Sequence, residues 1–163
     1  MFSHFTRHYY SPIPEVGKLR DDARASRSLT CIRVGPLGIA HAISLCKDFV
    51  GDDKFVVYLG DNILQNGIKS YLRDFVDSNY DAMILLKEVE DPTRFGVAEF
   101  DKDGRLARLV EKPKVPPSKY ALVGVYFLTP LIFDVIRRLK PSWRGEYEIT
   151  DALQILIKLG TGS

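Results

Sequence analysis

The stretch Phe55–Asn62, with the sequence FVVYLGDN, indicates which kind of fold this chain adopts. Its first five residues, Phe55–Leu59, are apolar or aromatic, a pattern typical of a strand buried on both faces in a parallel sheet. The run stops at Gly60 and is followed by a carboxylate, Asp61, and a carboxamide, Asn62. Ligands of open α/β sheets bind at the carboxyl ends of the strands, because the loops there carry polar groups while the strands stay packed. We therefore expect Asp61 to lie at a ligand site.

The segments on both sides of this stretch alternate between strand and helix patterns. Short apolar runs predict strands, and apolar residues at helical spacing predict helices. The predicted elements are strands at 29–34, 55–59 and 81–89 and helices at 39–50 and 68–78. This alternation predicts an α/β fold, a Rossmann-like three-layer α/β/α arrangement with a mostly parallel sheet.

The pattern changes after residue 89. Two predicted strands, 96–100 and 105–112, are joined by Asp101–Gly104, whose glycine suits a hairpin turn, so we expect an antiparallel excursion. A long apolar strand at 120–129 follows. The last predicted elements are helices at 131–139, after Pro130, and at 148–160, ended by Gly160.

Residues 1–28 differ from the rest, because they mix prolines, arginines and serines without a period. We expect this segment to be irregular and poorly ordered. The remaining residues, 29–163, are expected to form one partial domain, since 163 residues with 45% hydrophobic content suffice for one substantial core.

Composition excludes several classes of function. The formal charge of +2 includes no polybasic face beyond the first thirty residues, so no nucleic-acid polymer is expected as a partner. No apolar run approaches the ~18 residues that a membrane span needs. Cys31 and Cys46 lack a disulfide spacing and are read as reduced core thiols, which favours a cytoplasmic location.

Three places could carry chemistry. Asp61 could ligate Mg²⁺, although aspartate after a strand is also common as a turn or cap residue. Glu111 and Lys112 could accept hydrogen bonds from sugar hydroxyls and neutralise a phosphate, or they could form a solvated, charged strand edge. Gly96 would let a ligand approach the backbone closely, or it could mark a bulge.

Two further stretches are open to more than one interpretation. The loop Gly35–Gly38 opens a helix, where free N–H groups could meet a phosphate or a base, although no P-loop motif is present. His41 in that helix is read as structural. The acidic residues within Arg144–Asp151 suit either the capping of the last helix or ligand contact.

Six motifs occur in a fixed order along the chain. They are PLGIAHA (36–42), FVVYLGDNIL (55–64), DPTRFGVAEFD (91–101), VEKP (110–113), ALVGVYFLTP (121–130) and RGEYEITDAL (144–153). Together they resemble the sugar-1-phosphate nucleotidylyltransferases, most closely the glucose-1-phosphate thymidylyltransferases, over about Thr30–Gly160. Such enzymes have a Rossmann-like fold and use Mg²⁺ to couple a nucleoside triphosphate to a sugar 1-phosphate, releasing pyrophosphate.

The resemblance implies roles for particular residues. Asp61 would hold Mg²⁺, and Lys112 would hold the attacking phosphate, so these two are the catalytic candidates. The residues implied at the sugar are Asn62, Gly96, Glu111, Lys112 and Val123. The residues implied along the nucleobase are Pro36, Leu37 and Gly38.

The chain departs from the family pattern in three respects. The Gly-rich loop that cradles the triphosphate is not found in residues 1–30, and Arg33 stands where the family has a base-reading glutamine. A second metal-binding aspartate would lie beyond Ser163. We therefore expect a truncated or frame-disrupted family member, weak or inactive alone.

The sequence leaves the function between two classes. One is an enzyme of nucleotide-sugar biosynthesis that converts glucose 1-phosphate and dTTP, or UTP, to a nucleotide sugar and pyrophosphate. The other is a non-catalytic sugar-phosphate or nucleotide-sugar binding module with a regulatory role. A glycosyltransferase is less favoured, because Asp61-Asn62-Ile63 is not the Asp-x-Asp motif of those enzymes. Whether the chain forms a homo-oligomer is left open.

Overall fold

The computed structural model describes residues 37–160 apart from residues 63 and 66. The segment 1–28, the predicted strand at 29–34 and Pro36 therefore lie outside the described residues. The described helices and strands are, in chain order, α1 (Ile39–Ser44), α2 (Lys47–Val50), β1 (Phe55–Tyr58), α3 (Lys69–Val76), β2 (Ala82–Glu88), β3 (Gly96–Phe100), β4 (Leu106–Glu111), β5 (Tyr120–Leu128), α4 (Leu131–Ile136) and α5 (Ile149–Gly160).

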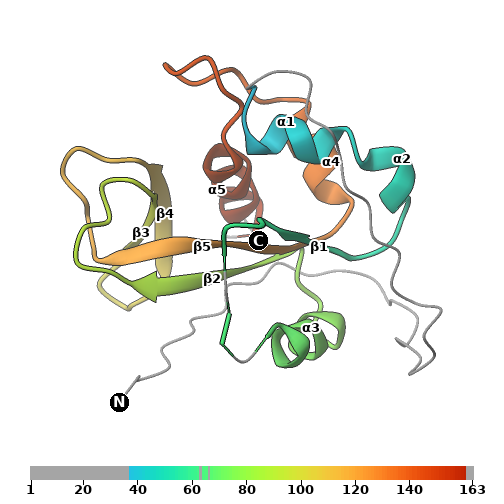
Figure 1. Ribbon diagram of the computed structural model, residues 1–163, viewed down its shortest axis with the longest axis horizontal. Coiled ribbons are helices and arrows are strands. Elements are labelled where there is room, and N and C mark those ends of the chain that lie inside the picture. The colour runs from blue at the N-terminus through green and yellow to red at the C-terminus, as the bar shows by residue number, and fades with distance from the viewer. Residues whose placement is uncertain (1–36, 63, 66, 161–163) are drawn as a thin grey trace.

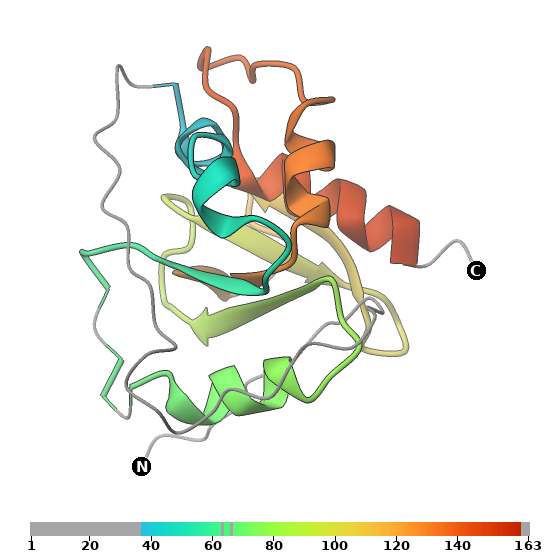
Figure 2. The ribbon, with the colours of Figure 1, turned by 90° about the vertical axis from the view of Figure 1, so that its right-hand side faces the viewer.

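The described part of the chain has three layers, as predicted. Helices α1, α2, α4 and α5 cover one face of a five-stranded sheet, and α3 covers the other (Figure 1, Figure 2). Each face has its own core. One buried cluster joins the sheet to α1, α4 and α5, and the smaller cluster joins it to Phe75 of α3. None of the helices in the described ranges is long and apolar enough to cross a bilayer.

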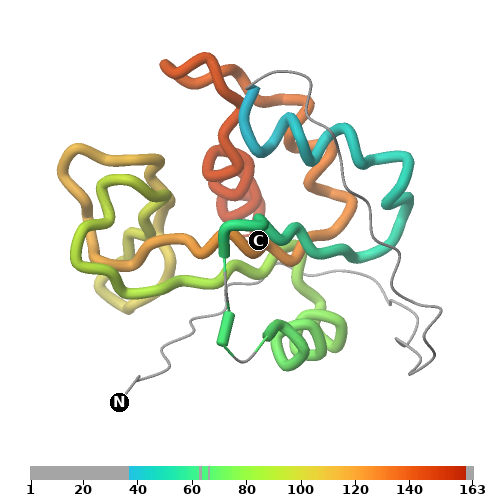
Figure 3. Tube along the Cα trace, viewed as in Figure 1, coloured from blue at the N-terminus to red at the C-terminus, as the bar shows by residue number. Residues whose placement is uncertain are grey.

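The prediction of a mostly parallel sheet is wrong for the described strands. Every pairing among them is antiparallel, because β5 lies between β1 and β2 and runs against both (Figure 3). Phe55 of β1 and Ala82 of β2 both pair with Leu128. An apolar strand buried on both faces is typical of a sheet interior, but its composition does not encode its direction. The β–α alternation therefore gave the layers correctly and the pairing of the strands incorrectly.

The predicted hairpin is confirmed, and it continues the same sheet. Strands β3 and β4 pair antiparallel, and β3 joins β5 through Val97 opposite Ala121. The turn is fixed by Asp101, whose Oδ1 accepts the N–H groups of Asp103 and Arg105 at 2.9 and 2.8 Å. The glycine of the turn, at position 104, has a φ of 74°.

The helix predicted at 39–50 is broken into α1 and α2. The N–H of Cys46 donates to the carbonyl of Ile43, three residues back, instead of four. The hydroxyl of Ser44 donates to the carbonyl of His41 at 2.6 Å, so it competes for an acceptor of the helix. The spacing of apolar residues is compatible with one helix, but these local hydrogen bonds end it after Ser44.

Candidate functional site

The loop after β1 is fixed against β5 by the side chain of Asn62. The Oδ1 of Asn62 accepts the N–H of Gly124 at 3.2 Å, and its Nδ2 donates to Oδ1 of Asp61 at 2.8 Å. A Cβ at Gly124 would overlap the Asn62 amide and come within 2.9 Å of Leu59 Cδ1. The glycine therefore makes room for Asn62, which in turn orients the exposed carboxylate of Asp61.

A second group of residues gathers where β3 begins and β4 ends. Gly96 lies opposite Glu111 in the hairpin, and the hydroxyl of Thr150 at the start of α5 donates to Oε2 of Glu111. A Cβ at Gly96 would lie 3.0 Å from Thr150 Oγ1 and 3.2 Å from Glu111 Oε2. The absence of a side chain at Gly96 therefore lets Glu111 and α5 approach the sheet closely.

Lys112 leaves the strand directly after Glu111. Its φ of 41° is the positive value of the left-handed region, which a residue with a side chain seldom adopts. Its N–H donates to the carbonyl of Phe95 at 2.9 Å, so the backbone is held to the chain that enters β3. The alternation of side chains along a strand therefore ends at Glu111, and the exposed Lys112 projects from a turn.

Tyr126 is a buried tyrosine whose pKa is affected by two carboxylates of the candidate site. It lies on β5, on the face covered by α4 and α5, and is 4% exposed. Burial raises the pKa of its phenol, and the carboxylates of Glu111 and Asp61 raise it further. Glu111 and Asp61 therefore both favour the neutral form of this buried phenol.

The loop before α5 places a cation, Arg144, near Glu111. Arg144 lies 2.7 Å from Oε1 of Glu146, 3.3 Å from Oε1 of Glu148 and 3.9 Å from Oε1 of Glu111. Burial raises the pKa of Glu148 above its usual range, and Glu111 and Glu146 also raise it, whereas the Ser142 hydroxyl and Arg144 oppose the shift. Arg144 thus partly neutralises three carboxylates that would otherwise repel one another.

The predicted base-binding loop is described only from Leu37 onward. Leu37 is 39% exposed, and Gly38 is buried at the start of α1. The backbone of Tyr147 holds the chain on both sides of Gly38. Its N–H donates to Leu37 O at 2.8 Å, and its carbonyl accepts the N–H of Ala40 at 3.1 Å. The loop at 37–38 is therefore attached to the segment that carries Arg144.

Val123 lies on the opposite side of the sheet. Its side chain packs on the α3 cluster, whereas Leu122 and Tyr126 belong to the cluster on the α5 side. Any contact of Val123 with a ligand on the α5 side would therefore come from its backbone.

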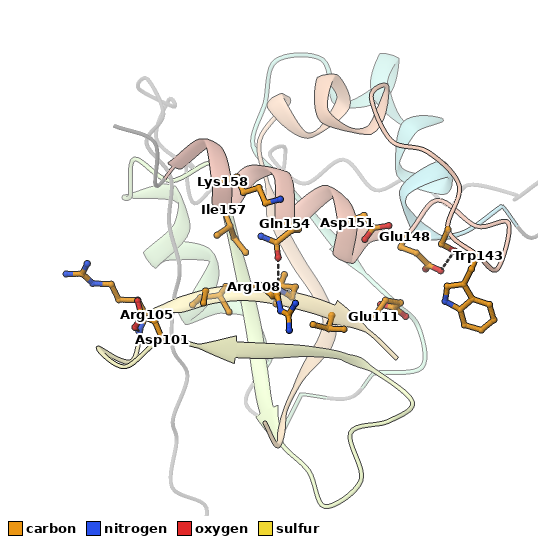
Figure 4. A pocket seen from close by; sticks show the side chains of 15 residues that line it. Asp101, Arg105, Arg108, Glu111, Trp143, Glu148, Asp151, Gln154, Ile157 and Lys158 are labelled. Carbon is orange, nitrogen blue, oxygen red and sulfur yellow. Dashed lines mark hydrogen bonds between the residues drawn. The ribbon is translucent and has the colours of Figure 1, made fainter. Parts of the chain in front are cut away.

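A groove extends from Glu111 along the outer edge of β4 (Figure 4). Its volume of about 840 Å³ lies in the usual range of ligand sites. Helix α5 forms the other wall, and Gln154 crosses the middle, where its Oε1 accepts the N–H of Leu109 at 2.7 Å. Of the predicted site residues that the structure describes, Glu111 alone lines this groove. Asp61, Asn62 and Lys112 do not.

Sequence reasoning missed four residues that complete the arrangement. Two of them, Gly124 and Tyr126, lie in the apolar strand ALVGVYFLTP, where nothing local indicates contact with Asn62 or with two carboxylates. The other two, Arg144 and Thr150, lie in the motif RGEYEITDAL, whose role was left open between capping and ligand contact. In the structure the hydroxyl of Thr150 donates to Glu111, and Arg144 lies beside three carboxylates.

The donor set is compatible with a metal ion held mainly by substrate. In the described ranges, His, Cys, Asp and Glu side chains form no group of three or more that could hold a metal. Asp61 offers one exposed carboxylate, oriented by Asn62. Magnesium commonly takes one or two protein carboxylates and completes its shell with water and phosphate oxygens. Asp61 therefore suits a magnesium ion better than a metal ion that protein side chains surround completely.

Fold and site define a class: a layered α/β domain with a carboxylate and a carboxamide shortly after β1 and a carboxylate and a lysine at the end of β4. The chain belongs to the nucleotidyl transferase family, whose model matches residues 17–162.

Two curated relatives are about half identical to this chain. A glucose-1-phosphate thymidylyltransferase of Streptomyces antibioticus is 51% identical over 142 residues, which cover 86% of this chain and 40% of the relative. The low-salt glycan biosynthesis nucleotidyltransferase Agl11 of Haloferax volcanii is 50% identical over 129 residues, 79% of this chain and 36% of that protein. The chain thus spans less than half the length of either relative.

Solved structures show the same likeness. A Bacillus anthracis protein assigned as a glucose-1-phosphate thymidylyltransferase, solved with a sucrose, matches with a TM-score of 0.68 and 46% identity. That match covers 76% of this chain and 50% of the other. A UDP-glucose pyrophosphorylase complexed with UDP-glucose matches with a TM-score of 0.64 and 29% identity over 76% of this chain and 51% of that one.

Proposed function

We propose that this chain forms the sugar-phosphate-binding part of a sugar-1-phosphate nucleotidylyltransferase. Such an enzyme transfers the nucleotidyl group of a nucleoside triphosphate, dTTP or UTP, to glucose 1-phosphate. The observation that carries the proposal is the placement of two strand-end carboxylates by hydrogen bonds, Asp61 by the Asn62 amide at 2.8 Å and Glu111 by the Thr150 hydroxyl. Relatives named as thymidylyltransferases and a pyrophosphorylase support the same reaction class.

The proposed chemistry is a displacement at phosphorus. A phosphate oxygen of glucose 1-phosphate attacks the α-phosphorus of the triphosphate. The new oxygen–phosphorus bond forms as the bond to the oxygen bridging the α- and β-phosphorus atoms breaks, and pyrophosphate leaves. A protein accelerates such a transfer chiefly by positioning and by neutralising charge.

Each residue of this chain has a defined part in the proposal. Lys112 neutralises the attacking phosphate from its exposed turn, and Glu111 accepts hydroxyl hydrogen bonds of the sugar. Gly96 leaves space for the sugar ring, and Asn62 offers its carboxamide as a hydrogen-bonding group. Asp61 would hold Mg²⁺, which when bound supplies charge neutralisation of the triphosphate. Leu37 and Gly38, with Pro36 outside the described residues, are proposed to lie along the base, and Val123 to contribute its backbone.

Calorimetric titration with glucose 1-phosphate, with and without Mg²⁺, tests this proposal. Lys112→Ala should weaken binding about tenfold, the effect of losing one charge-assisted contact of ~1.5 kcal/mol. The matched control is Lys114→Ala, which removes another exposed lysine two residues away. Equal affinities for the two variants would contradict the role of Lys112.

A non-catalytic binding module remains the second candidate, because Glu111, proposed at the sugar, lines the groove, whereas Asp61, proposed at the metal ion, does not. Measuring pyrophosphate release with dTTP or UTP and glucose 1-phosphate separates the two. Binding without release would favour the module, and release would favour the enzyme.

A further inference from the structure

The single tryptophan of the chain, Trp143, is 89% exposed. An indole is the largest apolar side chain, and at this exposure it contributes little to the core. Single exposed apolar residues are common on protein surfaces, so exposure alone does not indicate a role for Trp143. The residues around Trp143 do indicate a role.

The turn that carries Trp143 is fixed on both sides. The N–H of Ser142 donates to Glu146 O at 2.8 Å, and the N–H of Gly145 donates to Ser142 O at 2.8 Å. The hydroxyl of Ser142 donates to Glu148 Oε1 at 3.0 Å and accepts the N–H of Arg144 at 3.2 Å. The backbone at Trp143 is therefore held in place while its ring is left in solvent.

The ring lies at the end of the groove where Glu111 is found. Figure 4 shows Trp143, Glu148, Asp151 and Glu111 together at one end, with Arg105 at the other. The residue that follows Trp143 reaches Glu111 at 3.9 Å. An aromatic face and hydrogen-bond acceptors thus border the same end of the groove.

This combination suits a pyranose better than a nucleotide. A pyranose ring has an apolar face of C–H groups, which packs on an indole, and hydroxyl groups at its edge, which donate to carboxylates. The carboxylates of Glu111 and Asp151 disfavour phosphate groups at this end of the groove, so they suit the uncharged hexose ring there better than the triphosphate of a nucleotide.

We propose that Trp143 packs against the hexose ring of the bound sugar 1-phosphate and so contributes to selection of a pyranose. The inference rests on the proposed function and adds a residue to its sugar site. The Trp143 ring is exposed at the same end of the groove as Glu111.

Because the chain has no other tryptophan, its fluorescence tests the inference directly. Glucose 1-phosphate should shift the emission to shorter wavelength, with saturation at the same concentration as in calorimetry. Inorganic phosphate and dTTP should leave the emission unchanged. Calorimetric binding without an emission change would overturn the inference and leave the proposed function intact. The absence of both signals would refute both, and a response to dTTP alone would overturn the sugar assignment.

Variants provide an independent measurement. Trp143→Ala should raise the Kd for glucose 1-phosphate about fivefold, a typical effect of one aromatic contact, and Trp143→Tyr should restore most of the affinity. The control is Val115→Ala, since Val115 is 86% exposed and does not line the groove. All three variants should unfold at the wild-type temperature. Unchanged affinity in Trp143→Ala would contradict the contact.

Discussion

At the scale of single residues, the site depends on a missing side chain as much as on charged ones. Asn62 reaches the backbone of β5 only because position 124 is glycine. This dependence is not visible in the sequence, where Gly124 interrupts an apolar strand without a local reason. Asp61 and Glu111 lie after β1 and at the end of β4, as the sequence predicted, whereas Tyr126, whose pKa both carboxylates raise, read only as core.

We expect Gly124→Ala to destabilise the protein by about 1–3 kcal/mol, because the new methyl group forces Asn62 and Leu59 to move. Affinity for glucose 1-phosphate should fall as well, since Asn62 no longer orients Asp61. Urea unfolding and calorimetry measure the two effects. Gly60→Ala is the control, because a Cβ there has no neighbour within 4 Å. Equal stability of the two variants would show that the loop adapts without cost.

The buried carboxyl of Glu148 predicts a dependence of stability on pH. Its pKa is raised above the ordinary value of 4.5, so the folded chain binds this proton more tightly than the unfolded chain. The contribution of Glu148 to the free energy of unfolding therefore increases as pH falls from above the folded pKa toward 4.5. Glu148→Gln should lack this increase when urea unfolding is followed between neutral and acid pH.

Asp91 gives a control of opposite sign. Hydrogen bonds from the Thr93 side chain and backbone lower the pKa of Asp91, so its contribution is lost as pH falls through the folded pKa. Relative to Asp91→Asn, the wild type should therefore lose stability in acid. The same trend for Glu148→Gln and Asp91→Asn would refute the assignment for Glu148.

At the scale of elements, a single lysine attaches α3 to the sheet. Lys54, directly before β1, donates to the carbonyls of Phe75, Val76 and Ser78 at 2.8, 3.1 and 2.7 Å. These carbonyls lie at the end of α3, where intrahelical partners run out and a cation is favoured by the helix dipole. Lys54 also lies 4.8 Å from the centre of the Phe75 ring.

Lys54→Met should therefore lower the free energy of unfolding by about 1–3 kcal/mol, because it leaves the carbonyls at the end of α3 without a charged donor. Urea unfolding measures the change. Lys69→Met, at the exposed start of α3, is the control and should cost much less. A similar loss in both variants would indicate a general effect of removing lysine charge.

Most described elements were predictable from apolar spacing, and their bounds agree with the structure to within one to three residues. The strand at 81–89 and the helix at 148–160 are β2 and α5. The helix at 39–50 was not predictable as two, because its break depends on which acceptors Ser44 and Cys46 choose. Local patterns encode the type of element better than its interruptions.

At the scale of the molecule, the order of the strands in the sheet was the part that sequence could not provide. Strands β1 and β2 run the same way with α3 between them, as the β–α pattern predicts, yet they are not neighbours. The long apolar strand β5 lies between them. Nothing in its composition distinguishes a central antiparallel strand from a parallel one, since both are buried on two faces.

The central position of β5 predicts where the fold is most stable. Amide hydrogen exchange should be slowest at Val125–Leu128, where β5 is flanked by β1 on one side and β2 on the other. The turn at 101–104 should exchange quickly. Exchange at Val125–Leu128 as fast as in the outer strand β4 would contradict this order of stability.

The same arrangement fixes when the sheet can form during protein synthesis. Residues 55–58 and 82–88 leave the ribosome early, but the pairings that the structure describes for them both need residues 120–128. Until these pairings form, the nascent chain carries two apolar segments that other chains or chaperones can bind. Translation therefore has to reach β5 before this described part of the sheet can assemble.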